Sequence, residues 1–344
     1  MLNAVPVFRS PYRSQAGFSL PEVLIAVTIL LIISSAVTSG LLQMTNSQRT
    51  IWNRTQLHAG VRSATELLQQ EVGQSGRVAL PGTVTLNGAV APGTTTATLT
   101  VVPAVADLRT IIFPGERLLV QPGSNEETVE VSGVTATQIT ILRSVDASDT
   151  TIQPFFVNAH ANGAAVMVFG GFANGIVPPG FLNGSTASKL KLYGDINGDG
   201  NMVYIEYTCD PAPAPPAVAA LVPPGTGNLY RNVMPFNQTA AKLAVTSSQV
   251  LLSNIQANPG GTACFTYMPS PLPIVGADTF VLDVAITLTV QTQTIDPITR
   301  QYQLETKALL NVSPRNVFNV WQLASAGVVN RVQPMPLTVR NLLP

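Results

Sequence analysis

The stretch FSLPEVLIAVTILLIISSAVTSGLLQM, residues 18–44, decides how this chain is organised. After Glu22, no charged side chain occurs until Arg49, a gap of 26 residues. An α-helix of about 20 apolar residues crosses the hydrocarbon core of a bilayer, so this stretch is long enough to span a membrane. We therefore predict a membrane-spanning helix over residues 23–44.

Glu22 is an ionisable group at the head of this apolar run. A carboxylate near the bilayer core costs free energy, so such a residue is expected to have a function. The alternative interpretation is an ordinary signal peptide, with Arg9 and Arg13 ahead of an apolar region that ends in small residues at 34–36. The ionisable Glu22 at the head of the apolar run argues against an ordinary signal peptide.

The sequence GFSLPE, residues 17–22, followed by an apolar helix, resembles the signal of type IV prepilins and pseudopilins. The resemblance implies that residues 1–17 are a leader, which a prepilin peptidase removes by cutting after Gly17 on the cytoplasmic side. It also implies that the new N-terminal Phe18 is methylated. In a filament a buried Glu22 needs a cation, and the α-amino group of a neighbouring subunit's Phe18 is suitable because cleavage creates it. Phe18 and Glu22 are therefore the expected assembly residues.

Beyond the membrane span, apolar residues recur at helical spacing, which indicates an amphipathic continuation: Leu57, Val61, Ala64, Leu68 and Val72. Glycines and a proline between residues 73 and 82 are expected to end this helix. We predict one helix within residues 18–80. Its first half is apolar, and its second half covers a sheet.

From residue 83 onward the sequence shows strand-like runs and no convincing helical stripe. The runs in the first part are separated by Gly, Pro, Asn and Asp, and they are 98–102, 109–113, 117–121, 128–132 and 138–142. They predict an inserted small β module over residues 83–170.

Two later segments, 279–290 and 301–313, alternate apolar and polar residues around an Asp296-Pro297 turn. They predict an antiparallel hairpin with one buried face, which in its second strand includes Leu304 and Ala308. A helix followed by such a sheet predicts an α+β fold, with a long N-terminal helix packed on an antiparallel β-sheet head. The head is expected over residues 171–344, including a C-terminal tail.

The helix, the later strands IEYTCD (205–210) and CFTYM (264–268), and the closing hairpin together resemble PilW-type minor pilins. This resemblance implies a non-enzymatic component of a type IV pilus, anchored in the inner membrane with its C-terminal head in the periplasm. It would then join other minor and major pilins at the cell surface to initiate or cap pilus assembly. Two alternatives remain: a pseudopilin of type II secretion, and an adhesin or DNA-uptake pilin that binds a ligand through residues 83–170.

One segment fits the pattern of a calcium-binding loop: Asp195, Asn197, Asp199 and Asn201, with Glu206 eleven residues after the first aspartate. The alternative is a polar, glycine-rich turn that leads into a strand, with Glu206 matching the pattern by accident. Calcium is therefore one candidate ligand, and no other cofactor is expected.

Cys209 and Cys264 each lie in a strand-like segment. An exported head would permit a disulfide between them, and two buried thiols are the alternative. The proline-rich run 210–225 cannot join a central sheet ladder and is expected to be a surface loop.

Composition narrows the function classes further. The chain has 18 basic and 18 acidic side chains, so it lacks the excess of cations that nucleic-acid binding needs. Its two histidines, His58 and His160, have no Cys, Asp or Glu at metal-ligand spacing, and neither GxSxG nor HExxH occurs. We predict neither an enzyme nor a nucleic-acid partner.

Overall fold

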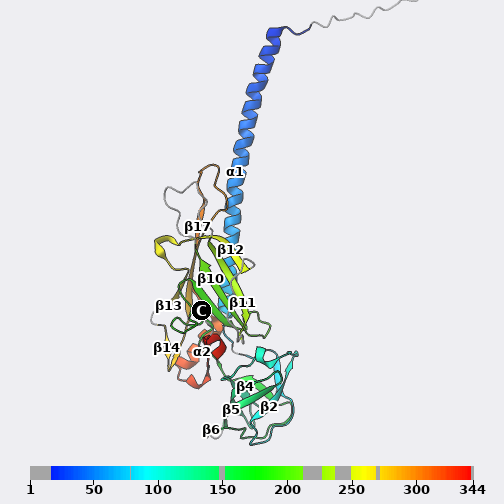
Figure 1. Cartoon of the computed structure of the whole chain (residues 1–344), viewed down its shortest axis with the longest axis vertical. Coiled ribbons are helices and arrows are strands. Elements are labelled where there is room, and N and C mark those ends of the chain that lie inside the picture. The colour runs from blue at the N-terminus through cyan, green and yellow to red at the C-terminus, as the bar shows by residue number, and fades with distance from the viewer. Residues whose placement is uncertain are drawn as a thin grey trace, which may run out of the picture.

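The computed structural model describes residues 17–77, 79–146, 152–211, 227–236, 249–268 and 272–341. The leader up to residue 16 and most of the proline-rich run 210–225 lie outside the described residues. The described chain forms a long helix, a β-rich head and a separate β-barrel (Figure 1).

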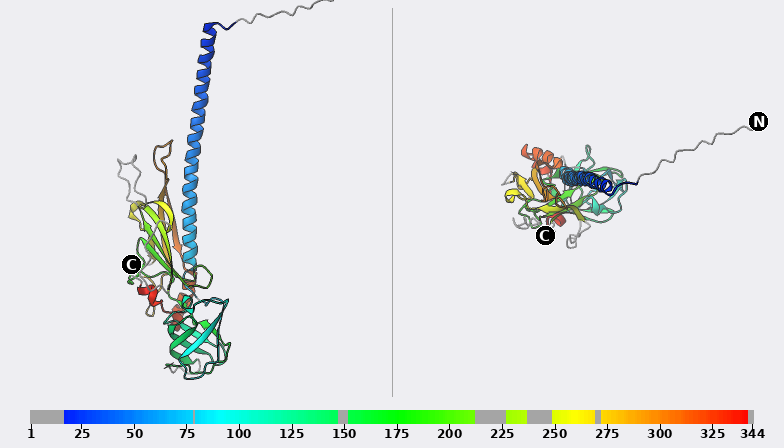
Figure 2. Two further views of the ribbon diagram at one scale, coloured as in Figure 1. Left: turned by 45° about the vertical axis from the view of Figure 1, so that its right-hand side comes forward. Right: turned by 90° about the horizontal axis from the view of Figure 1, so that it is seen from above.

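The first element, α1 (Leu20–Gln74), has two halves with different surroundings. Its apolar first half extends away from the rest of the molecule, as Figures 1 and 2 show. It contains an 18-residue window of mean hydropathy 2.3, none of which is buried. The second half packs on the head through the predicted stripe, in which Leu57, Val61, Ala64, Leu68 and Val72 are all buried.

The head is an antiparallel sheet with α1 lying on one of its faces. Its strands are β9 (Lys189–Gly194), β10 (Val203–Asp210), β11 (Gly227–Pro235), β12 (Val250–Gln256), β13 (Phe265–Met268), β16 (Asp283–Gln291) and β17 (Leu304–Val312). β16 pairs with β12 and β13 along one edge and with β17 along the other. The main core forms where the helix stripe meets alternate side chains of these strands, such as Ile205, Ile286 and Leu288.

The barrel is formed by the segment between α1 and the head. Its strands are β1 (Thr83–Leu86), β2 (Thr96–Val102), β3 (Arg117–Val120), β4 (Glu127–Val134), β5 (Gln138–Asp146), β6 (Ile152–Gln153) and β7 (Ala165–Val168). They pair in the order β2-β1-β7-β3-β4-β5-β6, and β5 pairs back to β2, so the sheet closes on itself. Closure removes the exposed edges of a small sheet, and the interior is filled by side chains such as Leu118, Val129 and Ile139.

The junction between barrel and head contains a buried ion pair. Arg77, just after α1, donates to the Glu116 carboxylate of the barrel, and both side chains are almost fully buried. The other oxygen of Glu116 accepts from Phe113 N at 3.2 Å. Burial is the main cause that raises the pKa of the Glu116 carboxyl, and the charge of Arg77 opposes that shift.

The C-terminal segment also fastens the barrel to the head. β18 (Val332–Gln333) pairs in parallel with β8 (Gly171–Phe172), at the point where the chain leaves the barrel. The Gln333 amide exchanges hydrogen bonds of 2.8–2.9 Å with the Arg117 backbone of the barrel. These contacts hold the barrel at the end of the head farthest from the N-terminal half of α1 (Figures 1 and 2).

Three sequence predictions about local structure are wrong. The predicted strand 109–113 is replaced by a 3-10 helix, Leu108–Thr110, in which the backbone N–H of Arg109 donates to the Asp107 carboxylate at 2.9 Å. The region after residue 83 also contains helices, α2 (Arg315–Ser325) and α3 (Leu337–Asn341). The α2 stripe of Val317, Val320 and Ala324 is short, and β-branched and Asn residues obscure it.

The third error concerns the buried face of β17. Leu304 is 63% exposed and Ala308 is also exposed. The ladder with β16 is irregular, because Ile286 pairs with Leu309 whereas Val284 pairs with Val312. Such a bulge shifts the alternation of side chains by one residue, so simple period-two counting assigns the wrong face.

The remaining short elements are 3-10 helices Pro259–Gly261 and Val329–Arg331, and the strand pair β14 (Ile274–Val275) and β15 (Asp278–Thr279).

Candidate processing and assembly site

Gly17 and Phe18 lie immediately before the first turn of α1, outside regular structure. The Phe18 side chain is 83% exposed. A peptide bond in an extended, accessible segment beside a helix can enter a protease site without unwinding that helix. The structure thus leaves the bond after Gly17 reachable.

Ser19 is the N-cap residue of α1 and has extended backbone angles (φ −75°, ψ 146°). Its carbonyl accepts from Glu22 N at 3.0 Å and from Val23 N at 3.1 Å. Glu22, at the third helical position, reaches back so that its Oε2 lies 3.4 Å from both Ser19 N and Ser19 Oγ. A carboxylate here also lies at the positive end of the helix dipole, where a negative charge is electrostatically favourable.

The Glu22 side chain is exposed in the single subunit. Its contacts at 3.4 Å are long, so they are weak and easily exchanged for a stronger cationic partner. Behind it, the apolar surface of α1 is equally uncovered, with Ile25, Leu30 and Leu31 each more than 60% exposed. This arrangement suits a membrane and a bundle of like helices, and it offers no chemistry for a small substrate.

Another acidic residue of α1, Glu71, which the sequence analysis missed, fixes the helix to the head. Glu71 is buried and accepts hydrogen bonds from the Tyr207 hydroxyl of β10 and from the Arg231 guanidinium of β11, with Arg231 Nε at 3.0 Å. Burial, reinforced by the Glu71 charge, raises the pKa of Tyr207 well above its ordinary value, so its hydroxyl stays protonated. The sequence did contain a signal for this role. Glu71 lies three residues after Leu68 and therefore on the same face of the helix as the apolar stripe.

The barrel contains a buried acid–imidazole pair. Glu127 accepts from Val157 N at 2.7 Å and from the Ser144 hydroxyl, and it lies 2.9 Å from His160 Nε2. Burial alone would raise the pKa of Glu127, but the hydrogen bonds from His160, Ser144 and backbone N–H groups lower it overall. Ser144 contacts the carboxylate rather than the imidazole, so these residues do not form a nucleophile–base pair. The other histidine, His58, pairs with Glu305 on the surface at 2.6 Å.

The predicted calcium-loop residues form a tight turn between β9 and β10. Asp195 Oδ1 accepts from Gly200 N at 3.1 Å, and Asp199 Oδ1 accepts from Asn201 N at 2.9 Å. Gly200 has a positive φ of 84°, and a Cβ there would lie 1.8 Å from Pro81, so the turn packs against the link to the barrel. Glu206 lies on β10, where it accepts from Tyr204 at 3.0 Å and pairs with Lys189 at 3.7 Å.

These contacts give Glu206 partners within the sheet. Among the residues that the structure describes, no three His, Cys, Asp or Glu side chains surround a point where a metal could bind. Calcium binding through Asp195, Asn197, Asp199, Asn201 and Glu206 stays a prediction. Calorimetric titration of the full chain with calcium tests it, with Asp199→Asn as the matched variant: heat that this variant abolishes supports the prediction, and no heat refutes it.

Cys209 of β10 and Cys264, just before β13, are joined as a disulfide in the structure, with their Cα atoms 6.4 Å apart. Both belong to the core beneath α1. The bond links β10, which lies next to the edge strand β9, to the strand that pairs with β16 of the closing hairpin.

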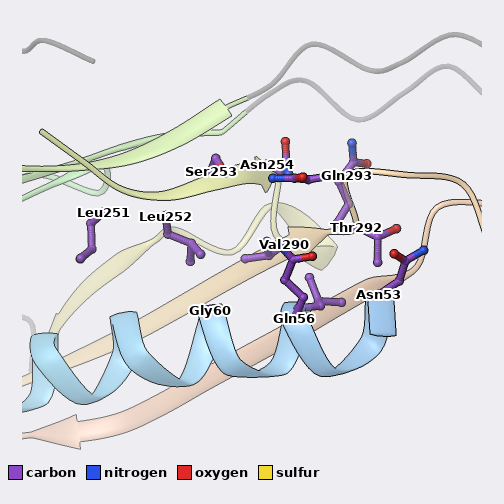
Figure 3. A pocket seen from close by; sticks show the side chains of 12 residues that line it. Asn53, Gln56, Gly60, Leu251, Leu252, Ser253, Asn254, Val290, Thr292 and Gln293 are labelled. Carbon is purple, nitrogen blue, oxygen red and sulfur yellow. The ribbon is translucent and has the colours of Figure 1, made fainter. Parts of the chain in front are cut away.

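Figure 3 shows a pocket of about 200 Å³ between α1 and the sheet, where β12 and β16 separate. Amide side chains surround it, including Asn53, Gln56, Asn254 and Gln293. None of its lining residues is ionisable, so it can form hydrogen bonds but cannot supply a general acid or base.

Comparison with known proteins adds one finding. The family described as the prokaryotic N-terminal methylation motif matches residues 12–38, which include Gly17, Phe18 and Glu22. No curated protein and no solved structure matches the chain. The chain therefore carries a type IV pilin-like signal at its N-terminus, followed by an apolar helix and a β-rich head with antiparallel sheets.

Proposed function

We propose that this protein is a minor pilin of a type IV pilus, of the PilW type. A prepilin peptidase removes its leader after Gly17, and α1 holds it in the inner membrane with the head in the periplasm. It is then drawn into the pilus, where it initiates or caps assembly with other minor and major pilins. The N-terminal signal and the uncovered apolar half of α1 support this proposal.

In the proposed assembly, Glu22 of one subunit pairs with the α-amino group of Phe18 in its neighbour. The buried bundle of helices excludes water, so an unpaired carboxylate there would be costly. The pair therefore sets the axial position of each subunit relative to the next.

The position of the barrel supports the proposed capping role. It lies ahead of the head, at the end opposite the exposed half of α1 (Figures 1 and 2). In a filament of parallel helices, subunits that follow can pack against the exposed half of α1. The barrel occupies the axial space in which the head of a preceding subunit would have to lie, and this favours a position at the tip.

Two variants test processing and assembly separately. Gly17→Ala is expected to leave the leader uncleaved. Glu22→Ala is expected to be processed and inserted in the membrane but absent from sheared pili. The matched control is Glu66→Ala, because Glu66 is an exposed acid on the same helix that pairs with the exposed Arg62 at 2.7 Å. Normal incorporation of Glu22→Ala, or equal loss in Glu66→Ala, would refute the assembly role.

The tip position is tested by an epitope inserted in the full chain at the β3–β4 turn, residues 122–125. This turn is mostly exposed and lies within the barrel. Immunogold label is expected only at pilus ends. Label along the shaft would contradict capping, and a requirement for protein secretion without any label on pili would favour a type II secretion pseudopilin.

A second candidate function follows from the same barrel position, since a module at the tip is the first to meet a surface. In that case residues 83–170 bind a ligand, as in an adhesin or a DNA-uptake pilin. Pili that form normally but no longer adhere or take up DNA after deletion of this segment would favour it.

A further inference from the structure

The turn between β16 and β17 reaches along α1 toward its apolar half (Figures 1 and 2). Side-chain hydrogen bonds of three residue pairs join it to the helix: Thr50 to Asp296 at 3.0 Å, Asn53 to Thr294 at 3.0 Å, and Arg54 to Gln303 at 3.1 Å. We call residues 45–55 of α1 and 294–303 of the hairpin the collar. It lies at the point where α1 leaves the head, with the hairpin on one side of the helix.

Asp296 gives the hairpin tip a defined shape. Its buried carboxylate accepts from Ile298 N at 2.7 Å and from Thr299 N at 3.2 Å, in addition to the Thr50 hydroxyl. These bonds close the turn and tie it to the helix. The tip therefore presents Ile298 outward, with 60% of that residue exposed.

The collar also exposes large apolar side chains. Ile51 is 65% and Trp52 70% exposed. Together with Ile295 and Pro297 they line a groove of about 700 Å³ between helix and hairpin. A large amphipathic ring such as that of Trp52 is favoured at a membrane–water interface.

The collar is also cationic. It contains Arg49, Arg54 and Arg300, whereas its single acid is Asp296, which is buried and hydrogen-bonded within the turn. In α1 itself no acid occurs between Glu22 and Glu66. The exposed charge of the collar is therefore positive, which complements anionic phospholipid headgroups.

The length of α1 places the collar near those headgroups. With Met44 at the edge of the hydrocarbon core, Arg49 lies about 8 Å and Trp52 about 12 Å farther along the helix. The headgroup layer on each side is about 5–8 Å thick. A helix tilt of about 20°, the average for membrane spans, brings the hairpin side down to that layer.

We propose that the collar docks on anionic phospholipid headgroups while the protein waits in the membrane. Arg49 and Arg300 contact lipid phosphates, and Trp52 and Ile298 lie against the water-facing side of the headgroups. This contact holds the head in one orientation against the bilayer and is broken on extraction. The inference rests on the membrane-anchored state of the proposed function.

The test uses the full chain in nanodiscs, with Trp321→Phe so that Trp52 is the remaining tryptophan. Quenching of Trp52 by headgroup-labelled lipid is compared between phosphatidylglycerol and phosphatidylcholine discs. An arginine near an anionic surface changes the docking equilibrium constant by about fivefold, so Arg300→Glu should reduce that constant at least fivefold. The matched control is Lys307→Glu, an exposed cation on β17 outside the collar.

Docking predicts strong quenching in phosphatidylglycerol discs that falls at about 1 M NaCl and in Arg300→Glu, but persists in Lys307→Glu. Equal quenching in both lipids, or equal loss in both variants, would overturn the proposal. Loss of pilus incorporation in Arg300→Glu without any change in quenching would also overturn it and assign the collar to a neighbouring subunit. Failure of the chain to insert in any nanodisc would instead contradict the membrane-anchored state itself.

Discussion

Replacing Glu71 by Ala should detach the second half of α1 from the head more than any surface change on that helix. The Glu71 carboxylate is the shared acceptor for Tyr207 and Arg231, and its side chain is only 6% exposed. Its removal leaves a buried hydroxyl without this acceptor and a guanidinium without this counter-ion.

The size of the effect follows from those two losses. Removing one partner of a buried ion pair costs about 3–5 kcal/mol. Because the Arg231 side chain is 27% exposed and can regain some hydration, we take the lower end, about 3 kcal/mol. For a head of this size that corresponds to a fall in melting temperature of about 6–12 °C.

The assay is urea unfolding of the full chain in detergent, with Trp52→Phe so that Trp321 reports on the head. Trp321 lies on α2, which touches the end of α1 where Asn316 Nδ2 donates to Gln74 O at 3.4 Å. Glu71→Gln keeps part of the hydrogen bonding and should lie between wild type and Glu71→Ala. If Glu71→Ala unfolds at the same urea concentration as the surface control Glu66→Ala, the proposed fastening role is wrong.

Two further predictions concern the barrel and the disulfide. The folded pKa of Glu127 lies below its ordinary value of 4.5, so its contribution to stability is present above pH 4.5 and is lost as pH falls through the lower, folded value. Glu127→Gln should therefore lower stability at neutral pH and flatten the acid limb of a pH–stability curve; an unchanged acid limb would contradict this. Thiol titration of the exported protein under denaturing, non-reducing conditions should find no free thiol at Cys209 or Cys264. Reduction should destabilise the head by about 4 kcal/mol for a separation of 55 residues, whereas two titratable thiols would refute the bond.

The long helix was predictable because its signals are local. The unbroken apolar run after Glu22 is long enough for a membrane-spanning helix, and the apolar residues from Leu57 to Val72 recur at helical spacing. Both patterns can be recognised without reference to the rest of the chain. The same holds for the order of residues 17–22. These features need no knowledge of distant contacts.

Barrel closure could not be predicted in the same way. The pairing of Thr96 with Thr140, which closes the barrel, joins strands whose partners are set by three-dimensional geometry. The Glu71 contacts are similar, since Arg231 lies 160 residues away along the chain. A sequence pattern can flag an acid on an apolar stripe, but it cannot name the cation that faces it.

The strand assignments failed where one residue changes the local geometry. At β17 a bulge between Leu309 and Val312 reverses the side-chain alternation. At residues 109–113 the Asp107 carboxylate caps a 3-10 turn in a segment whose composition favours a strand. Both are changes of local backbone geometry, and the spacing of apolar residues in the sequence does not reveal them.

The sharpest measurement is mass spectrometry of the mature N-terminus, on protein taken from membranes and from sheared pili. A chain that is anchored by α1 and assembled through Phe18 and Glu22 must begin at Phe18, carry a methyl group on its α-amine and retain all of α1. A mature form that starts near residue 37 and is recovered free of membranes would contradict the account.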